Sequence, residues 1–310
     1  MENLDIEFIQ PFTKILNTLN SYGWTMSPHM IGRDFQKVKA LCEQIETNPP
    51  TSGEEKSYYQ NNINQLLTTI IFHPLTRSFF IYRAQELKYI SKFSHHIEKS
   101  IMHYFKNDYF SAVHCLLPAI EGSLLAYIGW QYGTSRKPSI KVLIEEIEKC
   151  RKPMSRKKEY QLYSTALARF LKNWIFTDTN TADMSLSYLN RNYVLHGMGN
   201  DNYYSLSDCQ RLIVFFDLFI EFLSLEQGKR YAFIPEKNEK INSRETYYFR
   251  LLSYDLRKRE MMKTEEILMK EHSFYFHEHN ATNWNSFLKT ALKEHLNLMK
   301  ELKEFRKKKL

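Results

Sequence analysis

The chain has 310 residues, 43% of them hydrophobic, and a formal net charge of +8 at pH 7. Only 9 Gly and 9 Pro occur, about half their average usage; few tight turns favour long helices over a multi-stranded β fold. The four cysteines are scattered without a Cys-x-x-Cys pair. This excludes an ordinary disulfide framework or zinc cluster and indicates a reducing, cytoplasmic location.

The ends and the apolar tracts give no membrane signal. The chain begins Met-Glu-Asn-Leu-Asp-Ile-Glu, with no apolar stretch behind it, unlike a signal peptide. The longest apolar tracts, 112–130 and 212–225, carry Glu121 in one and Asp217 and Glu221 in the other. Charged residues at those positions argue against membrane spans. We therefore expect a soluble protein with no membrane association.

Residues 1–85 predict a first helical unit of unknown role. Apolar spacing indicates helices over 8–22 and 27–47, and the Pro- and Gly-containing stretch 48–53 predicts a break. Trp24 follows a glycine at a predicted turn. We expect it to anchor this unit onto the next one.

Residues 86–228 predict a central antiparallel bundle, because several amphipathic segments follow one another with short connections. Asp108 is an expected N-cap, and Pro118 predicts a kink. The predicted helices cover 86–106, 109–129, 139–149, 156–176, a motif helix starting near Ala182 or Asp183, and a helix from Ser205 or Ser207 to just before Gly228. The overall fold class expected is all-α, with helical N- and C-terminal extensions around the bundle.

Positive charge is concentrated in two places. Residues 229–310, expected to add basic helices over 242–261 and 282–305, carry 19 Lys and Arg against 12 Asp and Glu. A predicted loop around Pro153 is the second place. Clustered cations suit a polyanion, although a solubilising surface has the same composition. The predicted RNA-binding residues are Lys149, Arg151, Lys152, Arg156, Lys157 and Lys158.

A short segment at the end of the motif helix carries the chemistry. Arg191, Asn192 and His196 precede Gly197, which is expected to end the helix. Cleavage of a phosphodiester requires a group that titrates near neutral pH and a fixed cation on the phosphate. The imidazole and the guanidinium of this segment meet both requirements.

Helix geometry leaves the pairing of these side chains open. On an ideal helix Asn192 and His196 lie about 40° apart, whereas Arg191 and His196 lie about 140° apart. The long arginine side chain, a loosened last turn at Gly197 or an arginine from a second protomer could each close that gap. The alternative is structural: His196 favoured by the helix dipole, and Gly197 as an ordinary C-cap.

Over residues 90–227 the chain resembles the HEPN ribonucleases. The segment 190–197 is similar to their Arg-x4–6-His motif, and residues 116–122 look like the preceding helix with an internal proline and acid. The resemblance implies a helical homodimer with a shared RNase site that needs no metal or cofactor. Arg191 and His196 match the catalytic pair, Asn192 the polar position after the arginine, and Glu121 an acidic position that orients the pair. Met198 stands where some members have a tyrosine that a partner nucleotidyltransferase modifies.

The resemblance also implies a mechanism and partners. His196 would take the proton of a ribose 2′-OH that attacks the adjacent phosphorus, and Arg191 would stabilise the developing charge. The products would carry 2′,3′-cyclic phosphate and 5′-OH ends. Many members are toxins or antiviral-defence effectors, so the expected partners are RNA, a second copy of the chain, and an antitoxin or defence-system protein.

Two other functions stay open from the sequence. One is a catalytically silent HEPN scaffold or sensor subunit that binds a partner. The other is a basic helical nucleic-acid-binding protein with an incidental motif. Other histidines give weaker signals for a metal or nucleophilic site: the cluster His272, His277 and His279, the adjacent His95 and His96, and the His114–Cys115 pair.

Overall fold

The computed structural model describes residues 2–27, 35–71, 73–149, 157–177, 189–191, 194, 205–229, 238–253, 293 and 297. Residues 1–252 form one compact unit and residues 253–310 a second one. In the second unit, the described residues Ser253, Lys293 and Asn297 are helical. The helices below belong to the first unit, except for Ser253, the last residue of α11.

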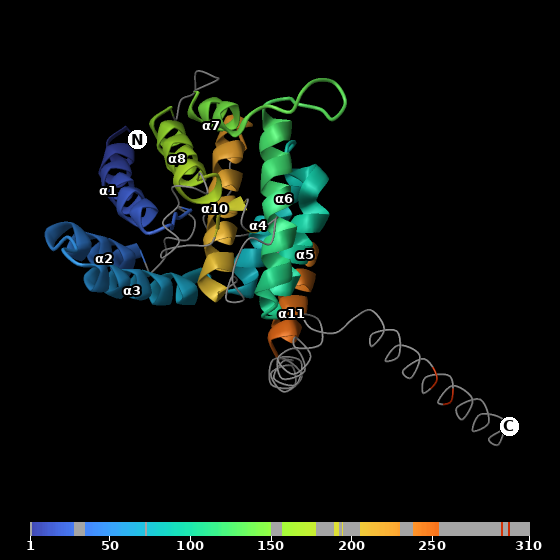
Figure 1. Cartoon of the computed structure of the whole chain (residues 1–310), viewed down its shortest axis with the longest axis horizontal. Helices are drawn as coiled ribbons and strands as arrows, with labels where there is room; N and C mark the ends of the chain where they lie inside the picture. Colours follow the sequence, from blue (N-terminus) through green and yellow to red (C-terminus); the bar gives the residue numbers. More distant parts are fainter. Residues whose placement is uncertain are drawn as a thin grey trace, which may run out of the picture. The chain divides into compact units, whose positions relative to one another are not determined.

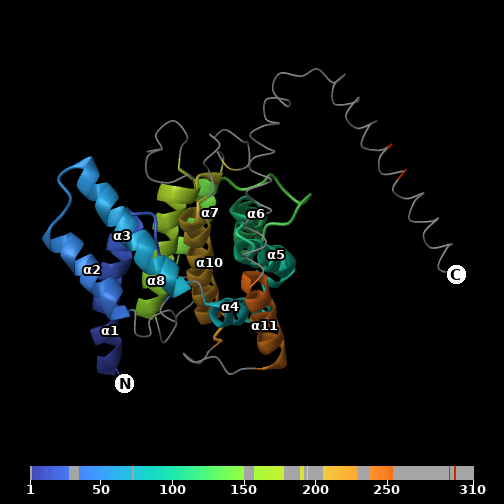
Figure 2. The ribbon, with the colours of Figure 1, turned by 90° about the horizontal axis from the view of Figure 1, so that it is seen from below.

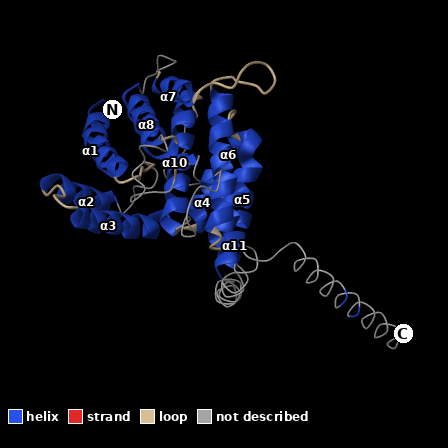
Figure 3. Cartoon of the chain, in the orientation of Figure 1, coloured by secondary structure: helices blue, strands red, loops and turns tan. Residues whose placement is uncertain are grey.

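The described residues contain helices and no strand, which confirms the all-α fold class (Figure 3). The α-helices are α1 (Glu2–Ser21), α2 (Phe35–Thr47), α3 (Gly53–Ile71), α4 (Pro74–Glu86), α5 (Ser94–Phe105), α6 (Tyr109–Tyr127), α7 (Ile140–Glu148), α8 (Lys157–Phe170), α10 (Leu206–Glu226) and α11 (Glu239–Ser253). A 3₁₀ turn, η2 (Ser91–Phe93), precedes α5, and a π-helical segment, η3 (Leu171–Ile175), continues α8.

Side-chain caps fix several helix starts where the sequence predicts them. Asp108 accepts a hydrogen bond from the Ser111 N–H at the start of α6. Ser139 accepts one from Val142 at the start of α7, and Ser205 forms a reciprocal capping box with Asp208 at the start of α10. These caps satisfy backbone donors that the first helical turn leaves unpaired.

The prediction of one helix over residues 86–106 is wrong. The chain turns at residues 87–90, after α4, and α5 starts only at Ser94. Leu87 and Ile90 are fully buried in that turn, and burying their side chains outweighs continuing the helix. The predicted elements of residues 1–85 also omit α3, whose first half is mostly polar, and α4, whose apolar residues have no clear helical spacing.

Helix α10 lies at the centre of this unit. It contacts α3, α4, α6 and α8, and nearly all of its residues are buried (Figures 1 and 2). Contacts along α10 also show the direction in which α6 runs relative to it. Leu116 and Ile213 line one small cavity, and Tyr127 contacts Phe222 at the other end. Helices α6 and α10 therefore run parallel, while α5 and α6 form the expected antiparallel pair, in which Ser100 bonds to the carbonyl of Ala112.

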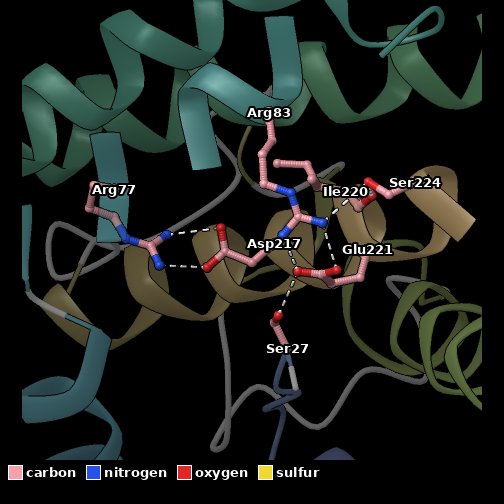
Figure 4. Close-up of polar contacts among 7 residues, drawn as sticks. All are labelled: Ser27, Arg77, Arg83, Asp217, Ile220, Glu221 and Ser224. Atoms are coloured by element: carbon pink, nitrogen blue, oxygen red, sulfur yellow. Dashed lines mark hydrogen bonds and ion pairs between the residues drawn. The ribbon is translucent and has the colours of Figure 1, made fainter. Parts of the chain in front are cut away.

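Two buried ion pairs join α4 to α10 (Figure 4). Arg77 holds Asp217 through two hydrogen bonds of 2.9 and 2.7 Å. Arg83 holds Glu221 at 2.5 and 2.8 Å, and the Ser27 hydroxyl donates to the same carboxylate at 3.2 Å. Burial raises the pKa of Asp217 to about 6, and the adjacent Arg77 opposes that rise.

The N-terminal helices share the core of the central ones. Trp24, fully buried, donates its indole N–H to Asn64 of α3 at 2.9 Å, and Arg211 of α10 lies over its ring. This confirms Trp24 as an anchor. One cluster of buried residues extends from Phe12 to Tyr248, so the boundaries expected at 85/86 and 228/229 fall inside one compact unit.

Helix α6 is a core helix. Among the described residues it is the one helix long and apolar enough to span a membrane, but more than half of that stretch is buried inside the fold. It continues through Pro118, whose ring is exposed. A Cβ at Gly122 would lie 2.4 Å from the Phe93 ring, so this glycine lets η2 pack directly on α6 beside Glu121.

The buried Arg83–Glu221 pair gives a prediction about stability. Arg83→Met should lower the free energy of unfolding by about 3–5 kcal/mol, because Glu221 is left buried without a countercharge. The double variant Arg83→Met/Glu221→Met should recover most of that loss. Urea unfolding followed by circular dichroism measures both.

The exposed Lys39–Glu43 pair on α2, 3.6 Å apart, is the matched control. Lys39→Met should change the free energy of unfolding by less than about 0.5 kcal/mol. Equal effects of Arg83→Met and Lys39→Met on the free energy of unfolding would contradict the prediction that breaking the buried pair costs more than breaking the exposed one.

Candidate functional site

Glu121 is the junction of the candidate site. It lies on α6 and is 9% exposed. Its carboxylate binds two cations: Lys137, from the loop that follows α6, at Oε1, and the Arg191 Nε–H at Oε2, 3.0 Å away. Residues 121 and 191, both predicted from the sequence, are thus in direct contact.

The backbone on either side of Arg191 is firmly packed. Leu189 and Val194 are buried, and Asn190 donates its side-chain N–H to the carbonyl of Thr177 at 2.5 Å. Thr177 lies two residues after the π-helical segment η3. Arg191 is therefore held between the end of η3 and the face of α6.

The predicted motif helix is not continuous up to the motif. Leu189 and Asn190 are not helical, whereas Arg191 and Val194 are, and the Val194 N–H donates to the Asn190 carbonyl at 3.1 Å. A continuous helix from Ala182 or Asp183 is therefore wrong. Asn190 takes the N-cap position, which asparagine favours, and Arg191 is the first helical residue.

Two predicted catalytic residues, Asn192 and His196, lie outside the described residues. The structure therefore brings together Arg191 and Glu121 and describes no contact of the imidazole. Arg191 begins a helical turn. The ideal-helix angle of about 140° between positions 191 and 196 therefore stays a prediction from the sequence.

Lys137 is the residue of this cluster that the sequence does not predict. It is half exposed and lies 16 positions from Glu121, in a loop without regular spacing. The available signal is the Arg136–Lys137 pair in an acid-free stretch directly after the helix that carries Glu121. The fold of the loop back onto α6 decides the contact.

Glu121 pairs with a cation on each of its two carboxylate oxygens. Two cations share one carboxylate, so the three side chains together carry one positive charge. The Arg191 side chain is 23% exposed, so an anion can reach it from solvent. A bond from Nε–H to a carboxylate fixes the plane of the guanidinium, and a fixed guanidinium matches the geometry of a phosphate.

Part of the predicted RNA-binding cluster is described. Lys149 follows α7, is exposed, and pairs with Glu146 at 2.5 Å. Lys158 is exposed in the first turn of α8. Lys157 begins α8, and the remaining three residues, Arg151, Lys152 and Arg156, lie outside the described residues.

The other candidates gain no support where they are described. His95 and His96 are exposed neighbours with their rings at 74°. The His114 Nδ1 lies 2.9 Å from the carbonyl of Phe110 in its own helix, and burial raises the pKa of the Cys115 thiol, which disfavours a thiolate nucleophile. The described residues hold no group of three His, Cys, Asp or Glu suited to a metal ion. The cluster of His272, His277 and His279 lies outside them.

No protein-family model, curated protein or solved structure matches this chain.

The contact between Glu121 and Arg191 predicts a measurable coupling. In a double-mutant cycle of Glu121→Gln and Arg191→Gln, the pair should contribute about 1 kcal/mol to the free energy of unfolding. Both side chains are mostly buried, so water screens them less than a surface pair. Urea unfolding of the four proteins gives the coupling.

A cycle on Lys39 and Glu43 provides the exposed reference, with an expected coupling of about 0–0.5 kcal/mol. A value for Glu121 and Arg191 no larger than this reference would show that the contact does not hold Arg191 in place.

Proposed function

We propose that the protein is an endoribonuclease of the HEPN type, cleaving RNA by attack of the ribose 2′-OH without a metal ion. In this proposal Arg191, Asn192 and His196 act as the catalytic motif and Glu121 positions the arginine. The proposal includes a homodimer, a cytoplasmic location, and a role as a toxin or antiviral-defence effector that a partner protein controls.

The contact between Glu121 and Arg191 is the observation that carries the proposal. These residues are 70 positions apart, and the sequence resemblance assigns them related roles at one site. A buried carboxylate next to an arginine has an ordinary structural use as well. Here, however, the arginine side chain keeps 23% of its surface exposed, as a group that meets a substrate must.

The roles divide according to chemistry. His196 is the one member of the motif that changes protonation near neutral pH, so it moves the proton. Arg191 stays charged and holds the phosphate, with its orientation fixed through Nε by Glu121. Asn192 selects the imidazole tautomer or contacts a phosphate oxygen. Attack by the 2′-OH then needs a substrate with a ribose, so DNA is not cleaved.

The silent scaffold is the second candidate, and one observation favours it. Glu121 binds both Lys137 and Arg191, so the cluster also serves to tie the 129–139 loop and the motif segment to α6. In a scaffold, holding these two segments against α6 would be the whole function of the cluster. The two candidates differ in whether the motif residues affect RNA.

The experiment is cleavage of labelled single-stranded RNA by the purified protein in EDTA. His196→Ala and Arg191→Ala should each lower the rate at least about 100-fold. Glu121→Gln should lower it about tenfold, because the arginine keeps its charge and loses its orientation.

Cys115→Ser is the matched control, expected to cleave at the wild-type rate. Absence of cleavage by the wild-type dimer would favour the scaffold. Cleavage that persists in both His196→Ala and Arg191→Ala would rule out this motif as the nuclease site.

A further inference from the structure

The loop between α6 and α7, residues 129–139, projects beyond the end of α6 (Figures 1 and 3). Tyr132 in this loop is 94% exposed, the largest exposure among the exposed large hydrophobic residues of the described part of the chain. An aromatic ring displayed this fully contributes almost nothing to the core. Packing in the core therefore does not explain why an aromatic residue stands at this position.

Local hydrogen bonds give this loop a defined shape. Gly129, with φ +83°, ends α6: its N–H bonds to Ala126, and the Trp130 N–H bonds back to Leu125. This is the Schellman arrangement, which requires a residue in the left-handed region. The sequence therefore turns the chain sharply outward at this point.

A second turn then presents the tyrosine. The Thr134 N–H bonds to the carbonyl of Gln131 at 3.3 Å, and Gly133 between them has φ +81°. A glycine with positive φ at the third position is typical of a type II turn, and Tyr132 takes the second position. The Trp130 indole packs edge-on against the Tyr132 ring and donates to the carbonyl of Ser135 at 3.3 Å.

The loop is also basic. Residues 129–141 contain Arg136, Lys137 and Lys141 and no acidic residue. Lys137 bonds to Glu121, so the base of the loop is joined to the cluster that contains Arg191. At most about 18 Å of chain separates Tyr132 from Lys137, which corresponds to no more than about five stacked nucleotides at about 3.4 Å each.

Lys158, one of the predicted RNA-binding residues, lies at the same end of the bundle. The Tyr127 hydroxyl, at the end of α6, is 3.3 Å from the hydroxyl of Tyr160 in the first turn of α8. Lys158 precedes Tyr160 by two residues, and α7 packs on α8. The loop, Lys158 and the Arg191 cluster are therefore neighbours.

We propose that the 129–139 loop is a contact surface for single-stranded RNA, on which Tyr132 stacks a base and Arg136 binds the adjoining phosphate. An exposed aromatic ring beside cations is the arrangement with which proteins hold single strands, because every base offers a face for stacking. As a guide for the substrate of the Arg191 site, this inference rests on the proposed nuclease; binding itself does not require cleavage.

The test is fluorescence anisotropy of the full chain with a labelled 2′-O-methyl oligonucleotide, which has no attacking 2′-OH. Tyr132→Ala should weaken binding about five- to tenfold, within the range for loss of one stacked base, and Tyr132→Trp should restore it. Tyr58→Ala on α3, a tyrosine 60% exposed, is the matched control and should bind like the wild type. Circular dichroism should show all three variants folded.

A backbone-matched abasic oligonucleotide separates stacking from charge. Arg136→Ala should weaken binding of both oligonucleotides, whereas Tyr132→Ala should affect only the one with bases. Unchanged affinity in Tyr132→Ala, an equal loss on both probes, or absence of wild-type binding would overturn the inference. An unchanged affinity would point to a protein partner for the loop instead.

The cleavage assay keeps the two proposals apart. If Arg191→Ala stops cleavage while Tyr132→Ala binds and cleaves like the wild type, the nuclease stands and the loop inference fails. If Tyr132→Ala weakens binding but the wild type cleaves no RNA, the loop inference stands and the nuclease fails.

Discussion

Helix α10 is surrounded by other helices and still carries two carboxyl side chains, Asp217 and Glu221, in the protein interior. Buried carboxylates must be paired, since an isolated charge is far too costly away from water. Arg77 and Arg83 of α4 supply the two partners, and only one register of α4 along α10 satisfies both. The two ion pairs thus fix how α4 docks on α10.

The position of the candidate site follows from that docking. Helix α4 leads through η2 into α5, which packs antiparallel to α6, and Gly122 lets η2 lie against α6. Glu121 next to this glycine therefore has a fixed place in the core. It is in turn the point to which the motif segment, through Arg191, and the 129–139 loop, through Lys137, are attached.

Local features of the sequence predict much of this fold. Asp108, Ser139 and Ser205 mark true helix starts, because capping depends on a few neighbouring residues. The helix over 86–106 and the continuity of the motif helix through 189–190 are wrong because tertiary contacts decide them: burial of Leu87 in one case and the bond from Asn190 to Thr177 in the other. The partners of Asp217 and Glu221 could not be predicted, since α4 has no clear apolar periodicity.

The residues of the candidate site likewise fall into those that the sequence predicts and those that tertiary contacts decide. Arg191 and Glu121 can be selected from residue types and a family resemblance, and the fold brings them to 3.0 Å. Lys137 cannot, because its contact depends on the path of an irregular loop. Asp217 and Glu221 are acidic residues within an apolar tract. Here such an acid indicates a buried, positively charged partner rather than a solvent-exposed face of the helix.

The most direct test of the central claim is a DNA oligonucleotide that contains a single ribonucleotide, incubated with the protein in EDTA. Transesterification by the motif predicts one cut, directly 3′ of the ribose, and a 2′,3′-cyclic phosphate on the upstream product. Cuts between deoxynucleotides, a 3′-OH upstream end, or cleavage that appears only on addition of a divalent metal would contradict it.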